Sequence, residues 1–183
     1  MLKRLLAARE TLLLGVLIAL LALIATRFPG FVAPANLANV FNDTSPLIIL
    51  ALGQMVVIVT RCIDLSVAAN LALTGMLVAM LNTVAPDLPI AVTLLVAVSS
   101  GAALGAVNGL LVWKFDIPPI VVTLGTMTIF RGIIFLISDG QWINAFEMSE
   151  RFTQFPRAVI LGLPVLGWIA VLIALGFVVL VTR

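Results

Sequence analysis

The sequence predicts an all-α polytopic integral membrane protein, a bundle of about six transmembrane spans in a single membrane domain of residues 1–183. Composition is the first reason: 63% of the residues are hydrophobic, only 10% are charged, and the mean hydropathy is +1.29. A soluble domain has roughly 25% charged residues, so this chain cannot cover a water-exposed surface. The second reason is that the apolar residues fall into runs close to the roughly 17–25 residues that a spanning helix needs.

The predicted spans follow one another along the chain with short polar breaks. They lie at residues 11–26, 46–60, 67–85, 88–113, 118–138 and 164–182. The second run is short, so it either extends through Ile63 and Leu65 or forms a re-entrant element. Asp64 and Ser66 are placed to cap the third span. Asp116 stands just before the proline pair that opens the fifth, and its carboxylate is placed to cap that span.

Two further stretches are not predicted to cross the membrane. Residues 28–45 hold Leu37, Val40 and Phe41 at helical spacing, which is typical of a short amphipathic helix at the outer interface. Residues 139–157 form the only long polar segment, with aromatic residues among the charges. We expect this segment to face outside, either as a solvated loop or as a contact surface.

Orientation follows from the excess of Lys and Arg in cytoplasmic loops. Placing the N-terminus in the cytoplasm puts six basic residues near span ends inside and three outside. The inside residues are Lys3, Arg4, Arg9, Arg61, Lys114 and Arg183, and the outside residues are Arg27, Arg151 and Arg157. The sequence therefore predicts that the N-terminus and the end of the last span are both cytoplasmic.

Polar side chains within the spans are the candidates for a solute path. Gln54, Asn70, Thr74 and Asn108 are the hydrogen-bonding groups that we expect around a neutral polar solute. Asn70 and Thr74 are four residues apart, so they share one face of a helix. The alternative for each residue is a hydrogen bond between helices.

The fifth span adds Thr123, Thr126 and Arg131. A charge near the bilayer centre costs about 2.5–3.5 kcal/mol on insertion scales, so Arg131 should face protein, water or a route to the surface. It is either a structural arginine or part of a polar pathway. The threonine hydroxyls can satisfy backbone carbonyls, so the same two roles are open to them.

Gly101, Gly105 and Gly109 repeat at four-residue spacing in the string GAALGAVNG. Small residues at this spacing let two membrane helices approach closely, so the pattern predicts helix packing. The alternative is a substrate-lining face that also uses Ser100 and Asn108.

Enzymatic chemistry is not predicted. The chain has no His and one Cys, which excludes a Ser-His-Asp or Cys-His arrangement and makes a metal site implausible. It holds no GxxxxGK[ST] phosphate loop, so no cofactor is predicted and any ATP hydrolysis would occur in a separate chain. No Asp or Glu lies clearly inside a span, which argues against a proton-coupled carrier.

The chain resembles a known family over nearly all of its length. Residues 39–76, NVFNDTSPLIILALGQMVVIVTRCIDLSVAANLALTGM, resemble the membrane permeases of bacterial ABC sugar importers, in the branch that includes ribose, xylose, rhamnose and autoinducer-2 systems. The signature of that branch looks like GIDLSVG. Here the motif residues are Ile63, Asp64, Leu65 and Ser66, and both flanking glycines are replaced, by Cys62 and Ala68. The flanks look most like the rhamnose-type permeases. The string PPIVVTLGT at 118–126 and the pair Arg131-Gly132 also match.

The resemblance implies a permease subunit of an ATP-driven importer of a monosaccharide, with rhamnose the first choice, in the bacterial inner membrane. Its partners would be a cytosolic ATP-binding subunit, a periplasmic sugar-binding protein and a second permease chain, as a homo- or heterodimer. Family members hold about twice as many spans, so this chain corresponds to the N-terminal half and the second half is absent. Residues 139–157 would be a contact for the binding protein.

Two other functions stay open at this point. One is a truncated permease remnant that does not transport, and the other is an ion-coupled secondary carrier. For the IDLS segment itself, Asp64 is expected to cap the third span, and Arg61 to pair with it or reach the cytoplasmic surface. The alternative is a direct part in the sugar path or in coupling.

Overall fold

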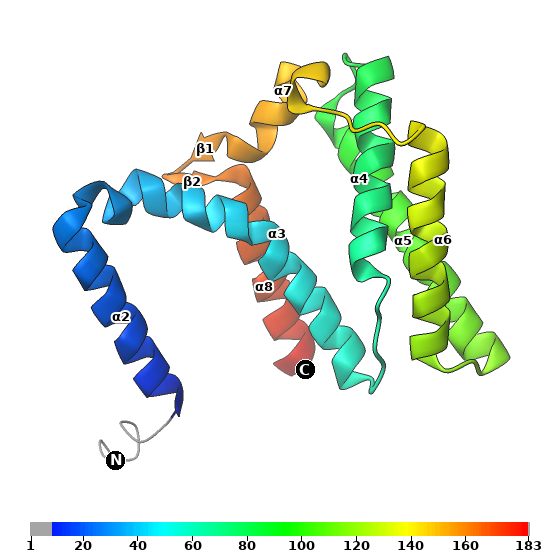
Figure 1. Cartoon of the computed structure of the whole chain (residues 1–183), viewed down its shortest axis with the longest axis horizontal. Coiled ribbons are helices and arrows are strands. Elements are labelled where there is room, and N and C mark those ends of the chain that lie inside the picture. The colour runs from blue at the N-terminus through cyan, green and yellow to red at the C-terminus, as the bar shows by residue number, and fades with distance from the viewer. Residues whose placement is uncertain (1–8, 183) are drawn as a thin grey trace.

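The computed structural model describes residues 9–182 and confirms an all-α membrane bundle (Figure 1). The long helices are α2 (Arg9–Arg27), α3 (Pro34–Val59), α4 (Val67–Val84), α5 (Ile90–Phe115), α6 (Pro119–Ser138) and α8 (Val165–Thr182). The short elements are η1 (Pro29–Val32), η2 (Ala145–Glu147), α7 (Glu150–Gln154), η3 (Phe155–Arg157), β1 (Val159–Ile160) and β2 (Leu163–Pro164). The two short strands pair antiparallel as a hairpin.

Most of the predicted spans correspond to long apolar helices. Within the described part of the chain, α3, α4, α5, α6 and α8 are long and apolar enough to cross a membrane, by length and composition. The apolar part of α2, Thr11–Arg27, is shorter. Five of the six predicted spans are therefore supported, and a crossing by α2 stays a prediction.

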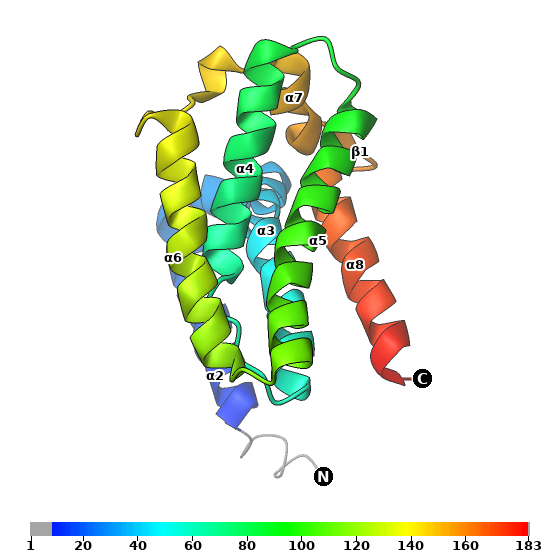
Figure 2. The same ribbon diagram turned by 90° about the vertical axis from the view of Figure 1, so that its right-hand side faces the viewer.

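The connections between helices alternate between the two ends of the bundle (Figures 1 and 2). The start of α2, residues 60–66, residues 116–118 and the end of α8 lie toward one end, which we call the Arg61 end. Residues 28–33, 85–89 and 139–164 lie toward the opposite end, which we call the Trp142 end. The cytoplasmic position of the Arg61 end stays a prediction. Three of the basic residues on which that prediction rests, Lys3, Arg4 and Arg183, lie outside the described residues.

The second span differs from its prediction. Instead of a short interfacial helix followed by a short span, residues 34–59 form one helix of 26 residues, with Pro46 inside it. At 1.5 Å per residue this helix is about 39 Å long, so its extra length comes from its N-terminal side. Ile63 and Leu65 do not extend it, because they lie in the non-helical segment beyond its end. Figure 1 shows α3 changing from a shallow to a steep course along its length.

Aspartates end two helices through their backbone. Asp116 follows α5 and Asp139 follows α6, with φ of 54° and 50°. This left-handed conformation closes many helices, and Asp tolerates it better than most residues. The expectation that Asp116 caps the fifth span is wrong: the N-cap of α6 is Pro118, which makes no side-chain cap bond within the described chain.

The helices pack in two groups, which residues 60–66 connect at the Arg61 end and residues 139–164 connect at the Trp142 end. α4 packs against both α5 and α6, around a small core of Ala69, Leu73 and Phe130, and α3 packs against α8. Large apolar side chains are exposed along most of the described helices, among them Val98 and Leu136. Such surfaces are expected where lipid or another protein chain covers a helix.

The α3–α8 contact depends on a glycine. Gly167 of α8 is buried, and a Cβ built on it would lie 2.9 Å from ring atoms of Phe41 in α3. Replacing Gly167 with alanine therefore forces the ring or the helix to move, which costs about 1–3 kcal/mol. We expect Gly167→Ala to lower the melting temperature of the purified protein by several degrees.

Gly176→Ala is the matched control. It lies in the same helix, and no described atom is within 4 Å of its built Cβ, so it should keep or raise the melting temperature. Equal effects of the two variants would contradict the close approach of α8 to Phe41.

Candidate functional site

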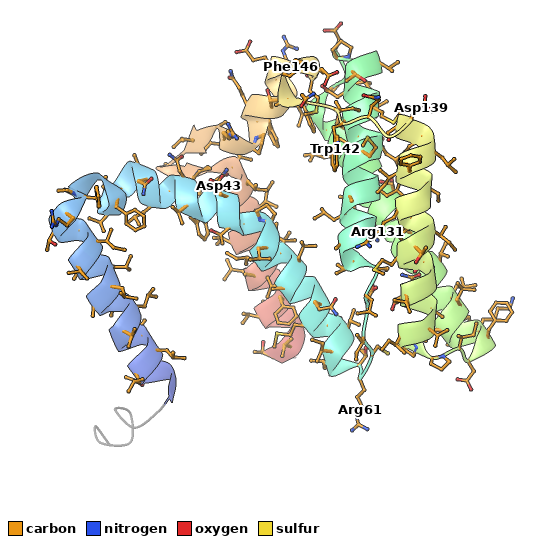
Figure 3. The ribbon with its side chains drawn as sticks, in the orientation of Figure 1. Asp43, Arg61, Arg131, Asp139, Trp142 and Phe146 are labelled. Atoms are coloured by element: carbon orange, nitrogen blue, oxygen red, sulfur yellow. The ribbon has the colours of Figure 1, made fainter. Side chains whose placement is uncertain are left out.

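The IDLS residues lie in a non-helical segment that enters the bundle between two helices. Residues 60–66 leave α3 at the Arg61 end and rise along the lower parts of the neighbouring helices before α4 begins (Figures 1 and 2). Arg61 has a φ of 61°, and its side chain extends away from the bundle (Figure 3). Non-helical backbone at membrane depth is tolerated only where protein buries it or where it lines a cavity.

Asp64 and Ser66 close the turn that starts α4. The Asp64 Oδ1 atom accepts hydrogen bonds from the backbone N–H and the hydroxyl of Ser66, both at 2.7 Å. Ser66 is the N-cap residue of α4 and is fully buried. Its side chain makes no cap bond to the first-turn amides within the described chain. The sequence suggested a bond to the amides of the first turn of α4. Instead, the Asp64 carboxylate accepts from the N-cap residue Ser66 and supports the helix start through it.

Side chains from three helices hold this turn in place. Asn108 of α5 donates from its side-chain amide to the Ser66 hydroxyl at 2.7 Å. Gln54 of α3 donates to the Asp64 carbonyl at 3.3 Å. Thr123 of α6 lies 3.4 Å from the Ile63 carbonyl and 2.9 Å from that of Pro119. We call this set, Gln54, Asp64, Ser66, Asn108 and Thr123, the Asp64 junction.

A cavity of about 230 Å³ lies beside the Asp64 junction. Three parts of the fold line it: the end of α3 with the segment after it, the second half of α5, and the start of α6. Lining residues include Val57, Cys62, Asp64, Gly105, Asn108 and Thr123. The cavity therefore brings together two of the predicted path residues, Asn108 and Thr123, with the aspartate of the family motif.

Two amide oxygens at the junction are free to accept a hydrogen bond. Gln54 Oε1 and Asn108 Oδ1 are buried and have no partner among the described residues. The orientation of Asn108 is fixed, because the single Ser66 hydroxyl proton goes to Asp64 and that hydroxyl must accept from the Asn108 amide. A buried acceptor without a partner costs about 1–3 kcal/mol. The junction is therefore suited to a donor such as water or a solute hydroxyl.

Asn70 and Thr74 take part in a different contact. The Asn70 amide donates to the Gly101 carbonyl of α5 at 3.2 Å, and the Thr74 hydroxyl lies 3.2 Å from Asn70 Oδ1. A Cβ built on Gly101 would lie 3.6–3.7 Å from these same two side chains. One hydrogen bond, from Asn70 to Gly101, therefore joins α4 to α5, and Thr74 supports it from within α4.

Gly105 and Gly109 are placed differently from Gly101. No described atom lies within 4 Å of a Cβ built on either residue, and both line the junction cavity. Their role in helix packing against another chain stays a prediction.

The remaining candidates of the fifth span do not meet at the junction cavity. Thr126 is buried and bonds within its own helix, to the carbonyls of Val122 and Thr123. Arg131 is exposed and lies nearer the Trp142 end, where it lines grooves with Met76, Ile134 and Trp142 (Figure 3). Its role, structural or in a pathway, stays a prediction.

Sequence reasoning missed one polar contact that positions the long outer segment. Asn82 near the end of α4 is 2% exposed, donates to the Ser149 hydroxyl at 3.1 Å and accepts from the Ser149 backbone N–H at 2.7 Å. These bonds hold residues 139–157 against the Trp142 end of α4. The signal was present, because Asn82 is an amide within a predicted span, as Asn70 is.

Known proteins resemble this chain over most of its length. Residues 36–183 match the family described as "Branched-chain amino acid transport system / permease component". The D-allose transport system permease protein AlsC of Escherichia coli (strain K12) is 34% identical over 171 residues, which are 93% of this chain and 51% of that protein. No solved structure matches the chain.

Two further relatives match the chain with similar identity and coverage. The ribose import permease protein RbsC of Haemophilus influenzae is 36% identical over 155 residues, 84% of this chain and 47% of that protein. The autoinducer 2 import system permease protein LsrC of Enterobacter sp. (strain 638) is 36% identical over 165 residues, 90% and 47% of the two chains. The chain thus spans about half the length of these curated relatives. Because the family match runs from residue 36 to residue 183, the chain belongs to the family of branched-chain amino acid transport system permease components.

Proposed function

We propose that this chain is part of the permease of an ATP-driven ABC importer for a monosaccharide, and that the Asp64 junction lines its solute path. One observation supports this most directly. Inside an apolar bundle, the non-helical stretch between α3 and α4 lies beside a cavity that is lined by Asn108, whose buried side-chain oxygen has no described partner. Discontinuous helices with polar groups at membrane depth are a common way to build a transport site.

A sugar suits this cavity better than an ion. Its lining offers amide, hydroxyl and carbonyl groups among apolar residues, with the Asp64 carboxylate already bonded to Ser66. The names of three relatives refer to D-allose, ribose and autoinducer 2, whereas the family description refers to branched-chain amino acids. Within the sugars, the residues that flank the IDLS motif favour a rhamnose-type solute.

The proposed importer needs other chains. A cytosolic ATP-binding subunit would hydrolyse ATP, a periplasmic sugar-binding protein would deliver the solute, and a second permease chain would complete the pathway. The assembly would lie in the bacterial inner membrane. The outer segment 139–157, held to α4 by Asn82, is the surface that we propose for the sugar-binding protein.

Uptake of labelled solutes tests this function. The native gene product that contains this sequence would be produced with its ATP-binding and sugar-binding partners in cells that lack sugar uptake. We expect ATP-dependent accumulation of L-rhamnose, D-ribose or D-allose and none of L-leucine. Uptake that follows a proton or sodium gradient without ATP would support a secondary carrier. No uptake of any solute would support a permease remnant that does not transport.

A further inference from the structure

A second polar cavity lies at the Trp142 end, far from the Asp64 junction. It has a volume of about 300 Å³ and is lined by Asn39, Asn42, Asp43, Arg157 and Pro164. The first three residues come from the N-terminal half of α3, and the last two from η3 and β2. Figure 3 shows Asp43 where α3 faces the β1–β2 hairpin. Ligand cavities in proteins occupy roughly 300–1,000 Å³, so this space can hold a small molecule.

Asn42 carries a side-chain acceptor in this cavity that no described group satisfies. It is 7% exposed, and its side-chain Oδ1 is buried without a partner among the described residues. Its backbone carbonyl also loses the usual helical donor, because the residue four positions later is Pro46, which has no N–H. The side-chain oxygen of Asn42 is thus left for a partner that the described chain does not supply, and its backbone carbonyl lacks the usual amide four residues later.

The other lining groups add both donors and acceptors. Asp43 brings a carboxylate that accepts, Arg157 brings a guanidinium that donates, and Asn39 brings an amide that does both. A metal cation would satisfy only the acceptors, and an anion would satisfy only the donors of Arg157 and the amides. A hydroxyl group both donates and accepts, so several hydroxyls on one molecule match the whole set.

We propose that this cavity is an outer binding site for a neutral polyhydroxylated solute, where a sugar binds before it moves toward the Asp64 junction. The proposal rests on the function proposed above. A branched-chain amino acid fits less well, because its side chain needs an apolar wall and Pro164 is the one apolar residue among the lining residues. Asn42 and Arg157 are the residues that would decide affinity.

Labelling of one introduced thiol tests this proposal. In a background in which the cysteines of the native gene product, Cys62 included, are replaced by serine, Asn39→Cys places one thiol at the cavity, since Asn39 is exposed and lines it. The reaction of this thiol with a maleimide would be timed in membranes that hold the native gene product, with and without L-rhamnose, D-ribose or L-leucine. We expect a sugar to slow labelling at least threefold and L-leucine to have no effect.

Matched variants distinguish the loss of sugar binding at this site from effects of substitution elsewhere in the protein. Arg157→Gln and Asn42→Leu should each abolish the protection by sugar, whereas Arg151→Gln, at an exposed position in α7 outside the cavity lining, should keep it. Protection that survives both cavity variants would overturn the outer site, as would equal protection by L-leucine or none by any sugar. ATP-dependent sugar uptake, measured in the same membranes, separates failure of this site from failure of the importer function.

Discussion

Replacing Asp64 with alanine should lower the amount of folded protein in the membrane several-fold. The change removes an acceptor of two short hydrogen bonds and leaves the N–H and hydroxyl of fully buried Ser66 without it. Hydrogen bonds to charged groups contribute about 1.5–3 kcal/mol each. A loss of even 1–2 kcal/mol is enough to change abundance several-fold.

The same variant should change sugar preference little. In the proposed path Asp64 would act on the solute only through the turn that it holds, because its Oδ1 is already bonded to Ser66. We therefore expect the ratio of uptake between two sugars, corrected for protein amount, to stay within about twofold of the native ratio, an estimate set by the indirect role of the group. Quantitative immunoblotting of membranes and paired uptake assays measure the two quantities.

Two other variants sharpen this test. Asp64→Asn keeps an oxygen acceptor without the charge, so its loss of folded protein should be smaller than that of Asp64→Ala. Asp87→Ala is the control, because Asp87 is exposed in the turn before α5. Normal protein amounts in Asp64→Ala together with an altered sugar preference would show that the carboxylate contacts the solute directly.

The sequence predicts the helices well because the bilayer fixes their length. Apolar runs of about 20 residues had to be spans, and α4, α5, α6 and α8 begin and end within a few residues of the predicted limits. The predicted start of the second span was wrong because a proline usually suggests a helix boundary. Pro46 removes one helical bond, but α3 packs closely on Gly167 through Phe41 and Ser45, just before the proline.

The sequence predicted which residues belong to the candidate site, but not which partners they bond to. The rule that polar groups inside spans need partners selected Gln54, Asn70, Asn108 and Thr123. Their partners depend on distances along the chain that no local pattern contains: Asn108 bonds to Ser66, 42 residues earlier, and Asn82 bonds to Ser149, 67 residues later. The sequence therefore did not separate the junction residues from the Asn70 contact between α4 and α5.

Gly105 and Gly109 allow the path and packing roles of α5 to be distinguished. A methyl group at either position meets no described atom within 4 Å and projects where the junction cavity is lined. Alanine is also more favourable than glycine in a helix interior by about 0.8–1.0 kcal/mol. If these residues line the solute path, the double variant Gly105→Ala, Gly109→Ala should keep or raise the melting temperature while uptake falls several-fold.

The opposite result identifies a packing surface. If another permease chain lies against these glycines, two methyl groups prevent its close approach, and both the stability of the assembled complex and its uptake should fall. Gly125→Ala in α6 is the matched control, because no described atom lies within 4 Å of its built Cβ. As a single change it should raise stability by about half as much as two such changes, without a loss of uptake. Since the first result separates stability from uptake and the second does not, thermal melting and transport of one preparation decide between the two roles.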